Sequence, residues 1–108
     1  MKRGEVWWVE FDPSVGSEIR KTRPAVIVSN NAANRNLLRV VVIPLSSNTS
    51  RVYPGEALIT VDGKPGKAMA DQIMAADKIR LKTQICTLSK ADMRALEQAI
   101  LVHLGLSK

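Results

Sequence analysis

The sequence predicts a mainly β fold, a small, strongly curved β-barrel or sheet that is capped by one C-terminal helix. Three observations predict it: short runs rich in valine and isoleucine recur along the chain, clusters of turn residues separate them, and a single stretch with helical periodicity comes last. The 108 residues include 45% hydrophobic residues, enough for one compact core, so we expect one domain over residues 1–108.

The first half of the chain is expected to supply three strands. Residues 6–11 alternate β-branched and aromatic residues with polar ones, and an Asp-Pro pair then ends the run. Residues 14–22 are polar, contain a glycine and lack an apolar period, which predicts a loop. The apolar runs at residues 24–29 and 38–45, joined by an asparagine-rich segment, are predicted to be central strands that are buried on both faces.

Shorter strands are expected in the second half. Residues 56–61 alternate in hydropathy, and the Asp-Gly pair at residues 62–63 and the Pro-Gly pair at residues 65–66 predict the turn that follows them. Two further strands are expected around residues 67–74 and 83–88.

The last element is a predicted helix. Ser89 is a good N-cap with Asp92 three residues later, and Gly105 is expected to end the helix. One helical face collects the apolar side chains Met93, Leu96, Ile100 and Leu104.

The chain is basic, with 16 Lys and Arg against 10 Asp and Glu and a formal net charge of +6. Such a balance suits a phosphate-rich partner, although an ordinary charged surface is the alternative. Arg20, Lys21 and Arg23 form a cluster that Arg35, Arg39 and Arg51 follow, while the acidic residues of that half mostly precede them, which indicates one basic face. With no long apolar run and no signal-like N-terminus, we expect a cytoplasmic protein without a membrane segment.

Several kinds of chemistry are excluded by residue type and spacing. Cys86 is the only cysteine, so neither an internal disulfide nor a cysteine cluster for zinc can form. His103 is the only histidine, is expected at the surface near the end of the helix, and cannot supply a pair of imidazoles. No HExxH, DxD or calcium-loop spacing occurs, and the glycines match no phosphate-binding loop, so we expect no metal and no cofactor.

What is left is an arginine, a hydroxyl and a carboxylate near strand ends, a set that is sufficient to split RNA through its own 2′-hydroxyl. The substrate then supplies the nucleophile, and the enzyme aligns it, stabilises the phosphorane and helps protons to move. Arg23 suits the second task because its guanidinium stays cationic and its planar fork matches two phosphate oxygens.

At this point the sequence resembles the MazF/PemK toxin family over nearly its whole length. Residues 3–13 (RGEVWWVEFDP) resemble the family's opening strand, and GSE at residues 16–18 followed by RPAVIVS at residues 23–29 resembles its gating loop and second strand. VIPLSS at residues 42–47 is similar to the strand that ends in the family's active-site Thr or Ser, and ADQI at residues 70–73 is similar to a later segment.

The resemblance implies a CcdB/MazF-type fold, a small SH3-like curved β-barrel, and a homodimer. It implies an endoribonuclease toxin of a type II toxin–antitoxin system that cleaves single-stranded RNA (mRNA) sequence-selectively and without metal. The expected products carry 2′,3′-cyclic phosphate and 5′-hydroxyl ends. The expected inhibitor is a cognate antitoxin with an acidic, disordered tail.

Carried over by position, the family's catalytic arginine falls on Arg23, its hydroxyl on Ser46 and its loop glutamate on Glu18. The adjacent Ser47 is an alternative hydroxyl, and either Glu18 or water is the acceptor of the 2′-proton. Residues expected to bind RNA are Arg20, Lys21, Ser47 and Gln72. The basic run before Arg23 departs from several relatives, which have smaller or neutral residues there.

Each assignment has a plainer alternative. Arg23 is otherwise a strand-edge cation, Ser46 a turn residue and Glu18 a solvated loop charge. Trp7 and Trp8 are candidates for stacking on bases, but adjacent strand residues face opposite ways, so at least one of them is expected to pack in the core or a dimer interface.

Two rival functions remain for this fold. A non-enzymatic poison of DNA gyrase, of the CcdB type, is expected to end in Trp-Gly-Ile, whereas residues 104–108 read LGLSK. An inert RNA-binding barrel is the other rival, and a gel assay that asks whether RNA shortens without added metal distinguishes it from a nuclease.

Overall fold

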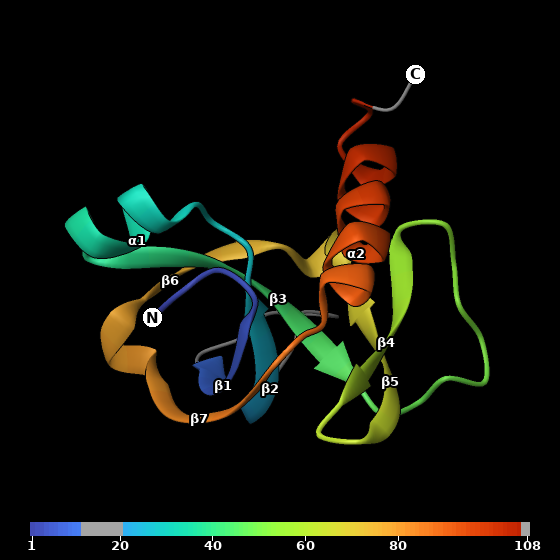
Figure 1. The fold of residues 1–108 in the computed structure, drawn as a ribbon, viewed down its shortest axis with the longest axis horizontal. Helices are drawn as coiled ribbons and strands as arrows, with labels where there is room; N and C mark the ends of the chain where they lie inside the picture. The colour runs from blue at the N-terminus through green and yellow to red at the C-terminus, as the bar shows by residue number, and fades with distance from the viewer. Residues whose placement is uncertain (12–20, 107–108) are drawn as a thin grey trace.

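The structure, a computed structural model, describes residues 1–11 and 21–106. A curved antiparallel sheet forms most of the molecule, with one long helix beside it (Figure 1). The strands are β1 (Glu5–Phe11), β2 (Lys21–Ile27), β3 (Arg39–Ser46), β4 (Glu56–Val61), β5 (Lys64–Met69), β6 (Met74–Asp77) and β7 (Leu81–Thr87). The helical elements are α1 (Asn31–Asn36), η1 (Ala70–Gln72), η2 (Lys78–Arg80) and α2 (Lys90–His103), of which η1 and η2 are single 3₁₀ turns. Within the described ranges, no helix has the length and apolar character needed to cross a membrane.

The strands pair in the order β4-β5-β3-β2-β1-β7, and β6 also pairs with β3. β4 and β7 end this path without pairing with each other, so the sheet is curved and barrel-like but open. The predicted fold class, mainly β with a C-terminal helix, is confirmed.

Strand β3 lies in the middle of the sheet and pairs with three other strands, β2, β5 and β6. One side of its first half pairs with β6 (Arg39 opposite Asp77), and its last residue on that side pairs with β5 (Ser46 opposite Lys67). Its other side pairs with β2, where Ile43 lies opposite Val26. As predicted, the apolar parts of β2 and β3 are buried on both faces of the sheet.

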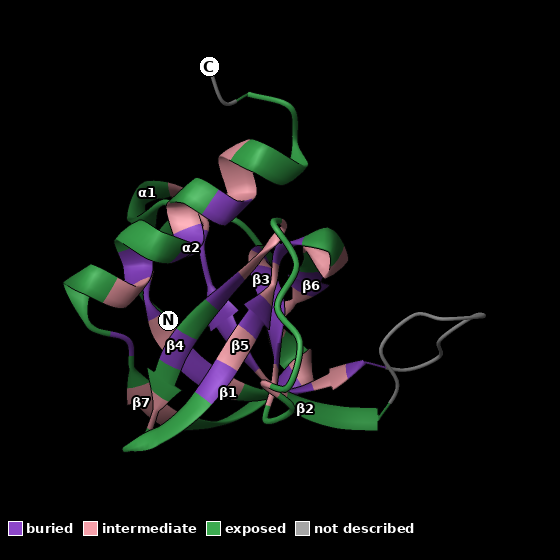
Figure 2. Cartoon of the chain, turned by 90° about the vertical axis from the view of Figure 1, so that its right-hand side faces the viewer, coloured by how far each residue is buried: buried purple, intermediate pink, exposed green. Residues whose placement is uncertain are grey.

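Two hydrophobic clusters account for this double burial (Figure 2). Val26 and Ile43 belong to the cluster beneath α2, which includes the fully buried Leu96. Their chain neighbours Ile27 and Val42 point to the opposite face and join the second cluster.

The predicted final helix and both of its caps are present. The Ser89 hydroxyl accepts a bond from the Asp92 amide at 3.1 Å, and Gly105 adopts a φ of 70° after the last turn. The Asp92 carboxylate accepts a bond from the Thr60 amide at 2.8 Å, which ties the start of α2 to strand β4. Of the predicted apolar face, Leu104 differs, since it is 50% exposed beyond the core.

Four parts of the sequence fold differently from expectation, and the first is α1. The asparagine-rich segment predicted to be a connection forms α1, because the Asn30 side chain caps it by accepting from the Ala33 amide at 2.8 Å. Asn34 is buried and donates to the Ser29 carbonyl at 2.9 Å, so these asparagines satisfy the backbone of a short helix rather than opposing it.

The second difference concerns the β4–β5 hairpin. Its turn is the Asp-Gly pair alone, where Asp62 and Gly63 have φ values of 51° and 81°, and residues 65–66 lie within β5 rather than in the turn. The single strand predicted at residues 67–74 is the end of β5, the turn η1 and the start of β6. In the same way, Lys21 and Thr22 begin β2 instead of ending a loop.

Candidate active site

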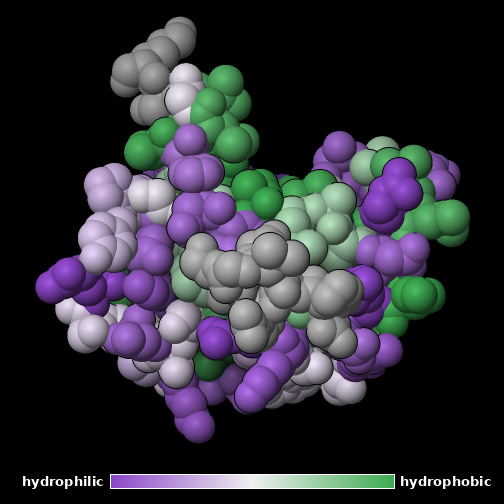
Figure 3. Space-filling view, turned by 180° about the vertical axis from the view of Figure 1, so that it is seen from behind, coloured by the Kyte–Doolittle hydropathy of each residue, from purple (hydrophilic) through white to green (hydrophobic). Residues whose placement is uncertain are grey.

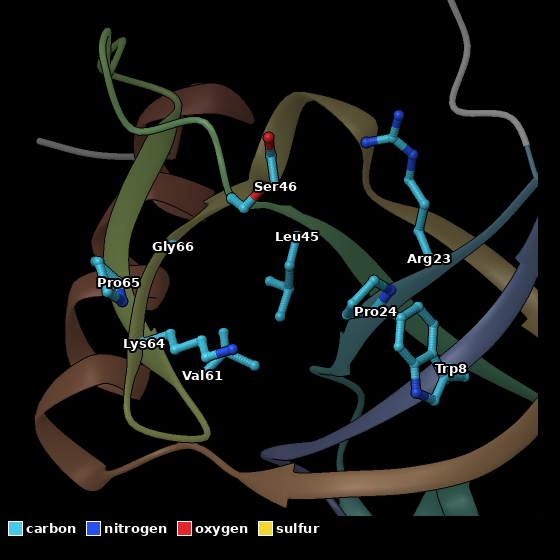
Figure 4. A pocket seen from close by; sticks show the side chains of 10 residues that line it. Trp8, Arg23, Pro24, Leu45, Ser46, Val61, Lys64, Pro65 and Gly66 are labelled. Carbon is cyan, nitrogen blue, oxygen red and sulfur yellow. The ribbon is translucent and has the colours of Figure 1, made fainter.

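A pocket of about 360 Å³ opens where β3 ends. It is lined by Trp8 of β1, residues 23–24 of β2, residues 45–47 at the end of β3, and Val61 with residues 64–66 of the β4–β5 hairpin. Figure 4 shows Arg23 and Ser46 along one rim, with the hairpin residues on the opposite side from Trp8. The sheet therefore brings together segments that are far apart in the sequence.

Arg23 is held at the rim by strand β2. It pairs with Val9 of β1, and the three residues Ala25, Val26 and Ile27 that follow Pro24 are completely buried and anchor the strand. The Arg23 side chain is exposed, and no carboxylate in the described part of the chain forms an ion pair with it. An unpaired guanidinium at the mouth of a pocket is available to an anionic ligand.

Ser46 is fixed by the turn that ends β3. Its hydroxyl oxygen accepts a bond from the Asn48 amide at 3.1 Å, and Asn48 in turn accepts from the Ser50 amide at 3.1 Å. These short side-chain turns stop the strand. Ser46 is half-buried, whereas Ser47 is exposed, and both line the pocket. Because the Ser46 oxygen accepts in this bond and donates to none of the described residues, its proton can be donated to a ligand.

The far wall of the pocket is the β4–β5 hairpin. Gly66 is buried there, and a Cβ at this position would lie 3.2 Å from the Ser46 carbonyl oxygen. A side chain would therefore push the hairpin away from the end of β3. Lys64 is exposed and points from this wall into the pocket (Figure 4).

Of the residues expected to bind RNA or to act in catalysis, the structure brings Arg23, Ser46 and Ser47 together. Glu18 and Arg20 lie outside the described residues. Lys21 is exposed at the start of β2 and Gln72 is half-buried in η1, and neither lines the pocket.

The sequence gives no signal that Lys64 or Pro65 belongs to the pocket, and it offers Trp8 as a base-stacking residue only together with Trp7. Trp8 was one of two adjacent tryptophans, and only the structure shows that Trp7 packs against the core while Trp8 faces the pocket. Lys64 stood among turn residues, where a lysine gives no signal of its own. The Asp-Gly turn was the one available clue, since it predicts a hairpin but not what that hairpin faces.

Within residues 1–11 and 21–106, no three His, Cys, Asp or Glu side chains are close enough to hold a metal ion together. Asp71 is exposed, and Asp77 is used to cap η2 by accepting from the Ile79 amide at 3.0 Å. His103 is exposed at the end of α2, beside Gly55.

A second pocket of about 500 Å³ lies between α2 and the sheet, but its two charged side chains, Arg3 and Glu97, form an ion pair with each other. Arg3 forms an ion pair with Glu97 at 2.9 Å and donates to the Val28 carbonyl at 3.0 Å. Of these two pockets, only the one at the end of β3 combines a positioned hydroxyl with a guanidinium that forms no ion pair with a described residue, and it is the candidate active site.

The sequence matches a family model described as a PemK-like, MazF-like toxin of type II toxin–antitoxin systems, over residues 2–104. The endoribonuclease MazF9 of Mycobacterium tuberculosis is 40% identical, with 98% of each chain covered. The endoribonuclease toxin MazF of Escherichia coli is 31% identical, with 94% of this chain and 92% of that one covered.

The fold is shared with solved structures. A mycobacterial endoribonuclease, solved in complex with its cognate antitoxin, superposes with a TM-score of 0.84 at 28% identity, covering 100% of this chain and 98% of that chain. MazF from Deinococcus radiodurans gives a TM-score of 0.85 at 24% identity, covering 97% of this chain and 96% of that chain, a likeness of fold.

Proposed function

The chain belongs to the PemK-like, MazF-like family of type II toxin–antitoxin toxins, and on that premise we propose that it is a metal-independent endoribonuclease that cleaves single-stranded RNA. One observation carries the proposal: the sheet places the Arg23 guanidinium, which has no ion-pair partner in the described part of the chain, and the fixed hydroxyl of Ser46 on one open pocket. This pair can hold a phosphodiester between a cation and a hydrogen-bond donor.

Arg23 stabilises the transition state. The 2′-oxygen of the RNA attacks the phosphorus, a bond forms between them, and the bond to the 5′-oxygen breaks. Negative charge grows on the phosphorane oxygens during this step, and the planar guanidinium donates to them and to the departing 5′-oxygen. A guanidinium stays protonated at neutral pH, so Arg23 acts as a cation and donor rather than as a base.

Ser46 holds a non-bridging oxygen of the same phosphate. We favour it over Ser47 because its oxygen is oriented by the Asn48 amide and it is half-buried at the end of β3, whereas Ser47 is exposed. A donor whose position is fixed in advance contributes more to the transition state than one that must be ordered.

The 2′-proton passes to Glu18 or to water, and the 5′-oxygen leaves as a hydroxyl with a proton from water. The products therefore carry 2′,3′-cyclic phosphate and 5′-hydroxyl ends. The substrate supplies the nucleophile, so no metal-bound hydroxide is needed. Arg20, Lys21 and Gln72 contribute to RNA binding outside the pocket in this proposal.

The proposal includes a homodimer in the cytoplasm and a cognate antitoxin as inhibitor. The net charge of +6 supports both of its anionic partners, RNA and an acidic antitoxin tail, because each gains from neutralising the same cations. The mycobacterial relative solved with its cognate antitoxin supports such a partner for this chain.

The test is incubation of a mixed single-stranded RNA with the purified chain in excess EDTA. We expect RNA fragments whose 3′ ends resist ligation until the cyclic phosphate is opened and removed. The Arg23→Ala chain, purified in parallel, controls for contaminating nuclease. Cleavage that EDTA abolishes and magnesium restores would contradict the mechanism, and binding of RNA without shortening would identify an inert RNA-binding barrel instead.

A further inference from the structure

The pocket contains more than the proposed chemistry needs. Arg23 and Ser46 occupy one rim, but the pocket is also lined by apolar side chains and by Lys64, which have no part in the proposed reaction. Figure 4 shows Trp8 and Pro24 on one side of the hollow and Pro65 on the other, with Lys64 reaching in from below Pro65. A hollow with an aromatic face on one side and a cation on the other suits a flat, charged ligand.

Trp8 is held facing this hollow by its neighbour. The Trp7 indole N–H donates to the Glu5 carboxylate at 3.0 Å, and Trp7 packs against the core on the inner face of β1. Trp8 consequently points to the other face, opposite Pro24 in the strand register, and is 42% exposed. An indole left in water at a pocket wall offers a flat surface on which an unstacked base can lie.

The hairpin turn fixes the backbone position of Lys64. Lys64 follows the two-residue turn in which Asp62 and Gly63 both have positive φ, and such a turn fixes the hairpin register. Its neighbour on the same strand shows the difference: Lys67 donates to Glu56 at 3.1 Å and to the Arg51 carbonyl at 2.9 Å. Among the described residues, Lys64 has no carboxylate partner.

The separation of the two cations across the pocket has a structural cause. Gly66 brings the hairpin against the end of β3, where its absent side chain leaves room for the Ser46 carbonyl. The hairpin wall therefore stands directly beside the proposed catalytic hydroxyl, and Lys64 lies across the hollow from Arg23 (Figure 4). An RNA strand that crosses the hollow would therefore meet one cation on each side.

We infer that Trp8 and Lys64 form a specificity subsite for the nucleotide next to the cleaved bond. The base of that nucleotide lies between Trp8 and Pro65, and its phosphate pairs with Lys64 while the scissile phosphate lies at Arg23 and Ser46. The inference rests on the proposed function, and it assigns to these side chains the choice and grip of a neighbouring base rather than the chemical step.

The test uses four variants: Trp8→Leu, Trp8→Phe, Lys64→Ala and, as the matched control, Lys90→Ala. Lys90 is an exposed lysine at the start of α2 that does not line the pocket, so its loss changes the net charge equally. Each chain is assayed for binding to a single-stranded oligonucleotide with 2′-deoxyribose throughout, which it cannot cleave, and for its cleavage profile on an RNA pool of random sequence.

We expect Trp8→Leu to bind the oligonucleotide roughly tenfold more weakly and to lose base preference at one position beside the cut, while Trp8→Phe retains most of both. Lys64→Ala should raise KM without lowering kcat and flatten the plot of log affinity against log salt by about 0.7, whereas Lys90→Ala leaves that slope unchanged. The Phe variant keeps the indole site filled by an aromatic ring, so a folding defect in the Leu variant would be recognised.

The outcomes separate the two proposals. If the wild-type chain cleaves RNA but Trp8→Leu and Lys64→Ala match Lys90→Ala in affinity, salt slope and base preference, the subsite is wrong and the nuclease assignment stands. If the wild-type chain cleaves no RNA, the nuclease assignment is wrong, and weaker oligonucleotide binding by the two pocket variants alone would still support a nucleotide subsite there.

Discussion

Strand β3 takes part in two regions of opposite character. Ile43 and Leu45 pack into the cluster beneath α2, while the next residues, Ser46 and Ser47, open into the pocket. Beneath α2 the side chains are buried and apolar, and no buried side-chain polar atom of the described residues lacks a hydrogen bond. In the pocket, Arg23 and Lys64 have no carboxylate partner among residues 1–11 and 21–106. Residues that stabilise the fold and residues that line the pocket are therefore adjacent on one strand. Single substitutions should affect either the stability or the proposed activity.

The largest expected effect falls on the core. Leu96→Ala removes a completely buried side chain from the cluster beneath α2, and we expect a loss of about 4 kcal/mol in the free energy of unfolding, from lost burial and the cavity that remains. Denaturant unfolding measures it. The rate of RNA cleavage at saturating substrate should stay near wild type under conditions where the variant is folded.

Leu58→Ala provides the control, because Leu58 is 57% exposed on β4 and its truncation should change the free energy of unfolding by less than about 0.5 kcal/mol. A Leu96→Ala chain that remains as stable as wild type, or that is fully folded but inactive, would break the separation between core and pocket.

The next effect falls on the pocket and reverses the pattern. Arg23→Ala should lower the single-turnover rate at least about a hundredfold, near 3 kcal/mol of transition-state stabilisation, by analogy with the loss of one oxyanion donor. Its free energy of unfolding should change by no more than about 0.5 kcal/mol, because the side chain is exposed.

Arg23→Lys sharpens this prediction, since it keeps the charge and removes the planar fork. We expect it to recover affinity for RNA but little of the rate. Near wild-type cleavage by Arg23→Ala would dismiss this residue as catalytic, and a large loss of stability would mean that the rim and the core are one unit.

The same contrast explains which parts of the structure the sequence predicts. Most strands and α2 follow from periodic burial, and the predicted caps Ser89 and Gly105 and the Asp-Gly turn lie where they were expected, whereas the predicted Pro-Gly turn does not. The family resemblance also points to Arg23 and Ser46, which the structure places on one pocket, while their catalytic roles stay a prediction. All of these predictions depend on patterns within short stretches of sequence.

What the sequence does not predict depends on which segments meet in space. The sequence does not predict helix α1, because asparagine is unfavourable inside helices. Only the structure shows that the Asn34 side chain has a hydrogen-bond partner there, the Ser29 carbonyl. Lys64 becomes part of the site only when Gly66 allows β5 to approach β3. The hydrophobic periodicity of a sequence does not show which distant segments pair with each other.

The smallest of these predicted effects concerns Glu5, the first residue of β1. This strand also carries Trp8 of the pocket wall. The Glu5 carboxylate is half-buried, which raises its pKa, but it accepts bonds from the Lys2 amide and the Trp7 indole, each at 3.0 Å, and lies near the N-terminal ammonium. These contacts outweigh the burial, so the pKa of Glu5 is lowered from its ordinary value.

A carboxyl whose pKa is lower in the folded chain stabilises the fold fully above its ordinary pKa and loses that contribution as the pH falls through the folded value. We therefore expect Glu5→Gln to reduce the free energy of unfolding by about 1 kcal/mol at neutral pH, since a neutral acceptor replaces a charged one. The difference from wild type should shrink in acid, as measured by denaturant unfolding at several pH values. Because the Glu5 bond holds Trp7 inward, the same variant should also lower affinity for RNA slightly by loosening Trp8. A stability difference that grows as the pH falls would show that the ionised carboxylate does not stabilise β1.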